Sequence, residues 1–163
     1  GFGAHGSIGQ IRKYTGEPYI EHPRAVAAIM DTIGAPEVAV AASLLHDTIE
    51  DVFWVTPELI RSIFGDEVTQ LVLEVTDVSK PSDGNRAVRK AMDRDHLAAA
   101  SDWGQTLKVA DLLHNRRTIV ERAPKFAPVY MTEMASVLDV LTRADPRLLA
   151  MARHLDVPAA IAA

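Results

Sequence analysis

The fold is decided by one stretch of the chain, which runs Val38-Ala39-Val40-Ala41-Ala42-Ser43-Leu44-Leu45-His46-Asp47-Thr48-Ile49-Glu50-Asp51. Its apolar first half is typical of a helix buried against a core, and four ionisable side chains follow within six positions at its polar end. Burying carboxylates and imidazoles there is costly unless they bind a partner or a metal. A helix would place His46 and Glu50 on one face, and Asp47 and Asp51 likewise, since each pair is four residues apart. An adjacent imidazole and carboxylate suit a divalent transition metal, so we expect a metal-binding patch here.

The apolar residues on either side of this stretch also repeat with a helical period, and alternating β-branched residues are scarce. Thr56 precedes Pro57, the pattern of an N-cap followed by proline at the first helical position. Gly65-Asp66 separates two helices, and the second carries a clear apolar stripe. The stripe consists of Val68, Leu71, Val72 and Val75. The sequence therefore predicts an all-α bundle of about eight helices, at 23–33, 37–50, 57–64, 66–78, 85–100, 105–122, 125–142 and 146–155. The Gly-rich residues 1–9 are predicted not to sustain a helix.

Length and composition limit the function classes. With 163 residues, 48% of them apolar, residues 1–163 are expected to form a single domain. The absence of cysteine excludes disulfides, thiolate catalysis and Cys-ligated zinc, and it fits a cytoplasmic location. We expect no membrane association, because no apolar run reaches the roughly 18 residues of a span and the first residues do not resemble a signal peptide. The formal net charge of −5 argues against a nucleic-acid partner.

Two further segments carry candidate ligands. Asp111 lies among apolar neighbours, so its carboxylate must be paired, protonated or metal-bound, and Asn115 lies one helical turn later. Read alone, Asp111 could be a core aspartate that caps a neighbouring helix, but the His46-Asp47 pair favours a metal ligand. His22 stands directly before Pro23 at a predicted helix start. A histidine in such a position is more often a cap or a surface residue, yet these residues together make a nitrogen-and-oxygen ligand set that leaves room for water.

Basic side chains gather in a third pattern. Arg86, Arg89, Lys90 and Arg94 fall on one stripe of a predicted helix. Such a stripe is often only a solvated face, but in an acidic protein with a candidate phosphohydrolase centre a phosphate-binding role gains weight. Arg12 and Lys13 are further candidates for binding an anionic substrate.

Three ordered blocks carry a family resemblance. They are 10–23, which contains Gly16-Glu17-Pro18-Tyr19-Ile20-Glu21-His22-Pro23, then 44–51, and then Lys108-Val109-Ala110-Asp111-Leu112-Leu113-His114-Asn115. The chain resembles the HD-superfamily metal-dependent phosphohydrolases, specifically the hydrolase domain of RelA/SpoT-type enzymes. In size it is similar to the stand-alone small alarmone hydrolases. A bare His-Asp pair is a weak signal, but the first block and the Glu-Asp pair after His46-Asp47 make the resemblance specific.

The resemblance implies an all-α HD domain that binds one Mn²⁺ per chain, with a small-molecule nucleotide as substrate. The implied activity is removal of the 3′-pyrophosphate from (p)ppGpp alarmones. Glu50 and Asp51 match the acidic pair that positions or activates water, Arg12 matches a residue that packs on the guanine base, and Asn115 matches a position near the ribose and the metal. The implied metal ligands are His22, His46, Asp47 and Asp111, and the implied phosphate contacts are Arg86, Arg89 and Lys90.

The sequence departs from the family pattern at one place, and two other functions fit the same residues. In the family, a helical run ends in His, and two residues separate that His from a Gln; here four residues separate His5 from Gln10, so no role is assigned to His5. The same ligand set would serve an HD-type nucleotidase or triphosphohydrolase acting on (d)NTPs or another phosphorylated nucleotide. A non-catalytic nucleotide-binding HD module is a second alternative, against which the Glu50-Asp51 pair argues. The oligomeric state is open, with a homodimer as one option.

Overall fold

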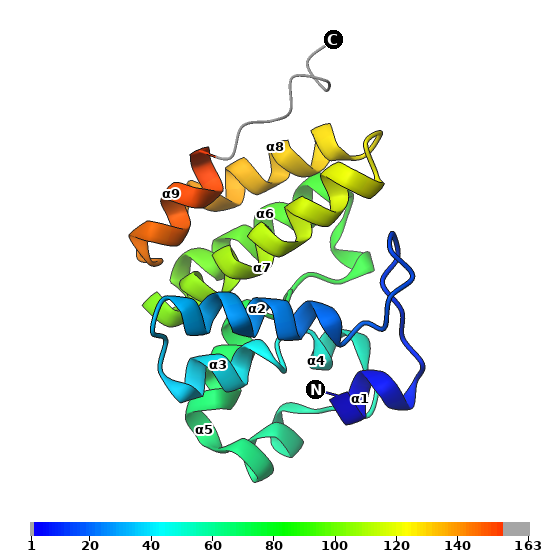
Figure 1. The fold of residues 1–163 in the computed structure, drawn as a ribbon, viewed down its shortest axis with the longest axis vertical. Coiled ribbons are helices and arrows are strands. Elements are labelled where there is room, and N and C mark those ends of the chain that lie inside the picture. Colours follow the sequence, from blue (N-terminus) through cyan, green and yellow to red (C-terminus); the bar gives the residue numbers. More distant parts are fainter. Residues whose placement is uncertain (1, 155–163) are drawn as a thin grey trace.

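The central element of the fold is helix α7 (Asp102–Arg122), in a computed structural model that describes residues 2–154 (Figure 1). The Ser101 hydroxyl begins this helix by accepting a hydrogen bond from the Gly104 backbone N–H at 3.2 Å, which is why α7 starts before the predicted residue 105. Leu107, Val109 and Ala110 are fully buried along it. Removing such aliphatic surface from water is the main favourable contribution to folding.

Helices from both halves of the chain pack around α7. On one side lie α2 (Glu21–Thr32), α3 (Glu37–Ser43) and α5 (Pro57–Val75); on the other lie α6 (Arg86–Ala99), α8 (Ala127–Leu138) and α9 (Pro146–His154) (Figure 1). The remaining elements are short: α1 (Phe2–Ser7), α4 (Thr48–Asp51) and the 3₁₀ turn η1 (Pro81–Asp83). The described residues contain one isolated β-bridge and no strand, which confirms the all-α class. None of the described helices combines the length and apolar character needed to cross a membrane.

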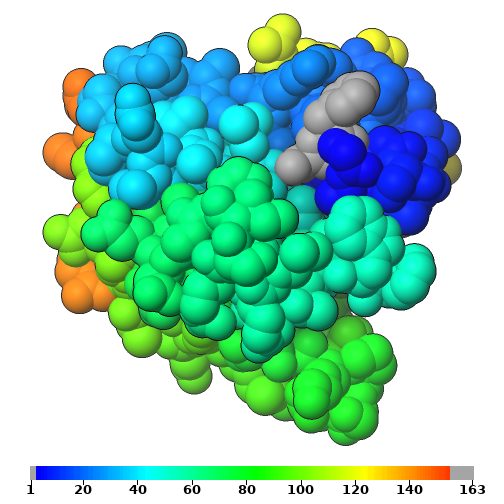
Figure 2. All heavy atoms as spheres, turned by 90° about the horizontal axis from the view of Figure 1, so that it is seen from below, coloured from blue at the N-terminus to red at the C-terminus, as the bar shows by residue number. Residues whose placement is uncertain are grey.

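Helix α5 behaves as the sequence predicts. The Thr56 hydroxyl accepts from the Leu59 backbone N–H at 3.3 Å, and Pro57 occupies the first turn. Gly65 breaks the helix internally with φ 85° and ψ 177°, a conformation open to glycine and strained for other residues. The second half buries the predicted apolar stripe. Figure 2 shows this face from below, with α5 in green at its centre, α3 in cyan beside it and α1 in dark blue at the edge.

The predicted continuous helix over 37–50 is wrong. Helix α3 ends at Ser43, residues 44–47 form turns, and α4 begins only at Thr48. Side chains take up backbone acceptors at this break: Thr48 Oγ1 donates to the Leu45 carbonyl at 2.6 Å, and His46 Nδ1 lies 2.8 Å from the Ser43 carbonyl. Such local bonds compete with the helical ladder. The face shared by His46 and Glu50 therefore does not exist, since His46 precedes α4.

Other boundaries also differ from expectation. Residues 2–7 form α1, although no helix was expected there, and α8 covers 127–138 rather than 125–142. Helix α2 begins at Glu21, so His22 lies inside its first turn. The other predicted ends agree with the structure to within three residues, except the end at 155, which lies outside the described residues.

Candidate metal centre and active site

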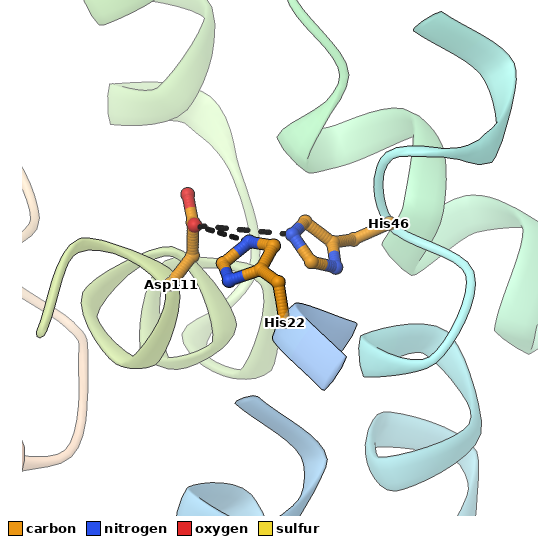
Figure 3. A group of neighbouring side chains, drawn as sticks. All are labelled: His22, His46 and Asp111. Carbon is orange, nitrogen blue, oxygen red and sulfur yellow. Dashed lines mark ion pairs between the residues drawn. The ribbon is translucent and has the colours of Figure 1, made fainter. Parts of the chain in front are cut away.

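Three elements bring imidazole and carboxylate groups to one buried point. His22 comes from α2, His46 from the turn after α3, and Asp111 from the middle of α7. His22 Nε2 lies 3.2 Å from Asp111 Oδ1, and His46 Nε2 lies 3.8 Å from the same oxygen. In Figure 3 the two rings point their nitrogens at the Asp111 carboxylate from different elements. All three residues are buried, and one donor atom of each lies within 4.8 Å of the others.

Asp47 extends this cluster. Its Oδ2 lies 3.1 Å from His46 Nε2 and 3.5 Å from His22 Nε2. The Tyr19 hydroxyl donates to Asp47 Oδ2 at 2.6 Å and fixes the carboxylate. Metal–ligand bonds of about 2.1 Å place neighbouring donor atoms roughly 3.0–3.4 Å apart. The measured donor separations in the set of His22, His46, Asp47 and Asp111 run from 3.1 to 3.8 Å, close to this range, and the set stays a prediction.

The hydrogen-bonding of His46 suits a metal ligand. A backbone carbonyl only accepts, so His46 Nδ1 carries the hydrogen that it donates to Ser43 at 2.8 Å. A neutral ring would then have its lone pair on Nε2, which is buried and faces Asp47 Oδ2 at 3.1 Å. A lone pair and a carboxylate oxygen cannot bond to each other, so either a proton or a cation must lie between them.

Neighbouring charges shift the pKa values of the residues in the cluster. Burial alone would raise the pKa of Asp111, but Lys108, whose Nζ lies 3.0 Å from Asp111 Oδ2, holds that pKa well below its usual range. Burial opposes protonation of His46, yet the Asp47 charge and hydrogen bonds raise its pKa to about 9 in the metal-free protein. Metal binding must therefore displace protons.

Glu50 and Asp51 lie beside this cluster and are held from different directions. Glu50 Oε1 accepts from the Asp77 backbone N–H at 2.7 Å. Although Glu50 reaches the surface, protein atoms around its carboxyl group exclude water and raise its pKa to about 7. The hydrogen bond from the Asp77 N–H acts in the opposite direction and lowers this pKa, but its effect is smaller. Asp51 Oδ2 accepts from Gln10 Nε2 at 3.0 Å, and Gln10 Oε1 lies 2.6 Å from His5 Nδ1. The wider spacing between His5 and Gln10 thus still brings their side chains together.

A cavity of about 350 Å³ lies beside Glu50, and we call it the basic cavity after three of its lining residues, Arg86, Arg89 and Lys90. Its other lining residues are Glu50, Asp77, Ser79 and Asp93. Lys90 Nζ is 3.2 Å from Asp77 Oδ2, and Arg86 makes two hydrogen bonds of 2.6 and 2.7 Å to Glu133. Arg89 Nε is buried without a hydrogen-bond partner. Three of the four predicted stripe residues thus line the basic cavity, and Arg94 lines the adjoining cavity together with Asp47 and Asp111.

Arg12 lies near the candidate ligands and lines a cavity together with His22. Its guanidinium donates to Asn115 Oδ1 and to Thr118 Oγ1, each at 3.2 Å, and Asn115 Nδ2 donates to Asp111 Oδ1 at 2.6 Å. Arg12, Asn115 and the exposed Lys13 line a cavity of about 140 Å³, together with Tyr14, Tyr19, His22, Thr118 and Ile119. The structure therefore brings Arg12 and Asn115 to the cluster and leaves Lys13 at the rim.

Sequence reasoning assigned no role to several residues of this site. Tyr19 supports Asp47, Lys108 pairs with Asp111, and His114 Nδ1 lies 2.7 Å from His22 Nδ1. Burial and the nearby positive charges of His22 and Arg12 lower the pKa of His114 to about 4, so its ring is neutral. The spacing of three residues between Lys108 and Asp111 on one helix is a signal that could have revealed their pairing.

Comparison with protein-family models identifies this architecture: the model described as HD domain matches residues 4–144. The chain belongs to the HD domain family. The matched residues include every residue of the site, from His5 to Asn115.

Curated relatives of this HD domain are longer proteins. It is 40% identical over 119 residues to a probable guanosine-3′,5′-bis(diphosphate) 3′-pyrophosphohydrolase of Synechocystis, a match that covers 71% of this chain and 16% of the relative. It is 42% identical over 112 residues to a GTP pyrophosphokinase of Streptomyces coelicolor, covering 68% and 13% respectively. The chain thus spans less than a fifth of the length of these relatives.

Solved structures share the fold over nearly their whole length. One, described as a metazoan orthologue of SpoT that hydrolyses ppGpp, superposes with a TM-score of 0.79 at 26% identity, covering 95% of this chain and 92% of the other. A second, from Listeria monocytogenes, superposes with a TM-score of 0.70 at 27% identity, covering 93% and 100%.

Proposed function

We propose that this HD domain hydrolyses (p)ppGpp, cleaving the bond between ribose O3′ and the pyrophosphate so that ppGpp and water give GDP and pyrophosphate. The observation that carries the proposal is the convergence of four candidate ligand side chains beside two acidic groups and the basic cavity. The likeness to a ppGpp-hydrolysing SpoT orthologue over 95% of the chain supports it.

His22, His46, Asp47 and Asp111 would hold one divalent cation, for which we propose Mn²⁺. Imidazole nitrogens with carboxylate oxygens suit a first-row transition metal. When bound, such an ion lowers the pKa of a water molecule and polarises a phosphoryl oxygen.

Glu50 and Asp51 are proposed to handle the attacking water. Glu50, with a pKa of about 7, can accept a proton near neutral pH, and efficient acid–base groups have pKa values close to the working pH. Asp51 is held by Gln10 and orients the water. The two carboxylates thus divide base and orienting roles.

The basic side chains are proposed to bind the substrate's phosphates, and Arg12, Lys13 and Asn115 its nucleoside. Arg89 lines the basic cavity beside Glu50, where it can offset the charge that develops on phosphate. Lys90 can do the same on leaving its ion pairs with Asp77 and Asp93. Arg86 joins them when its side chain leaves Glu133. Lys108 adds a further positive charge behind Asp111.

The test is product analysis on purified protein with Mn²⁺ and a panel of ppGpp, pppGpp, dNTPs and NADPH. We expect pyrophosphate and GDP from ppGpp, no product from dNTPs, and no turnover by His46→Ala. Release of phosphate or triphosphate from dNTPs, with ppGpp left intact, would instead assign a nucleotidase or triphosphohydrolase. Binding of ppGpp without turnover would assign a non-catalytic module.

A further inference from the structure

We propose that His114 is a positioning residue for the metal site: it accepts a hydrogen bond from His22 Nδ1, so that Nε2 is the nitrogen that gives up its hydrogen and binds a cation. The inference rests on the proposed metal site and adds a residue that contacts neither the cation position nor the reacting atoms. It is carried by the hydrogen bonds between His114, His22 and Arg12.

The direction of these bonds follows from their chemistry. His114 Nδ1 lies 3.3 Å from Arg12 Nη1 and 2.7 Å from His22 Nδ1. A guanidinium group can only donate, so His114 Nδ1 must present its lone pair to Arg12. The hydrogen of the short bond between the two rings must then belong to His22 Nδ1.

This assignment fixes the other face of the His22 ring. A neutral imidazole with hydrogen on Nδ1 has its lone pair on Nε2. His22 Nε2 points at Asp111 Oδ1 and Asp47 Oδ2, at 3.2 and 3.5 Å, where the cation is proposed to bind. The opposite tautomer would direct an N–H into that position and block coordination.

The two histidine ligands are therefore fixed in the same way by different partners. His46 donates from Nδ1 to the Ser43 backbone carbonyl, whereas His22 donates to the side chain of His114. The His22 and His114 rings also stack, with centroids 4.9 Å apart and planes 30° apart. Only the His22 support can be removed by substitution, and removing a partner of a metal-ligating histidine typically weakens metal binding about 10–100-fold.

The experiment is a titration of metal-free protein with Mn²⁺ alone, followed by calorimetry, for wild type, His114→Leu and His114→Asn. Leucine removes the acceptor, whereas the amide oxygen of asparagine can lie near the position of Nδ1. We expect His114→Leu to weaken Mn²⁺ binding about 10–100-fold and His114→Asn to restore it to within about threefold of wild type. His96→Leu is the matched control, because His96 is half-buried and hydrogen-bonded to the Leu73 carbonyl, away from this cluster.

Two results would overturn the inference: unchanged Mn²⁺ affinity in His114→Leu, or an equal loss in His114→Asn and His114→Leu. Thermal unfolding of the metal-free variants shows which of them are folded, and His114→Ala replaces the leucine variant if that one does not fold. Wild-type protein that binds Mn²⁺ and hydrolyses ppGpp, together with an unaffected His114→Leu, would refute the role of His114 alone. Wild-type protein that binds no Mn²⁺ would refute the metal site as well.

Discussion

Replacing Asp111 by asparagine should separate the two contributions of this carboxylate, to cation binding and to charge balance. In wild type, a cation that binds only the folded state stabilises it by about 2.7 kcal/mol at a concentration one hundred times its Kd. For a chain of 163 residues, each kcal/mol of added stability raises Tm by about 2–4 °C, so Mn²⁺ should raise Tm by about 5–11 °C. In Asp111→Asn this Mn²⁺-induced increase in Tm should vanish, because the variant lacks the carboxylate charge that His22 and His46 both face.

The same substitution should lower Tm without metal. It leaves Lys108 Nζ without a carboxylate at 3.0 Å, and the two side chains are only 19% and 6% exposed. Breaking a buried pair costs about 3–5 kcal/mol, and the partial exposure of Lys108 places the expected loss near the lower end. Differential scanning fluorimetry with and without Mn²⁺ measures both effects, with Asp139→Asn, in the turn after α8, as a control. A full Mn²⁺ shift in Asp111→Asn would refute the assignment of Asp111 as a ligand.

Three further substitutions test other parts of the molecule. Glu50→Gln should retain Mn²⁺ binding by calorimetry but lower kcat at least about 100-fold, and full activity would show that the proposed role of Glu50 is wrong. In wild type, kcat/KM should fall as the pH drops below about 7, because the protonated Glu50 carboxyl cannot accept a proton. Glu133→Gln should release Arg86 to the basic cavity and lower the KM for ppGpp several-fold at low salt, whereas an unchanged KM would place Arg86 outside substrate binding. Leu107→Ala should lower the free energy of unfolding by about 2–5 kcal/mol in urea titrations, because Leu107 is fully buried in α7; a loss under 1 kcal/mol would contradict its place in the core.

The sequence predicted the helices where local chemistry marks their ends. Thr56-Pro57 marks the start of α5, and Gly65 marks its internal break. It missed the turns at 44–47, because the apolar period continues through them and the break depends on side chains bonding to backbone carbonyls. It also missed α1, whose glycines argue against a helix while its buried Ala4 and His5 contact the rest of the protein.

The candidate ligands could be named in advance because each lies in a dense local motif. Their supporting partners could not, since those contacts join residues far apart in the chain. Gln10 reaches Asp51 across 41 positions, and Arg86 reaches Glu133 across 47. No local pattern encodes such pairs; the packing of α1 near α4, and of α6 against α8, creates them.

The bond from His46 to the Ser43 carbonyl has a consequence for mutational tolerance. Because the acceptor is a main-chain atom, a small side chain that fits the buried position 43 and preserves the turn leaves the orientation of His46 intact. His22 differs, because its orienting partner is the side chain of His114, which a substitution removes. Random mutagenesis scored for metal retention should therefore tolerate small residues with or without a polar group at position 43, and only residues that can accept a hydrogen bond at position 114.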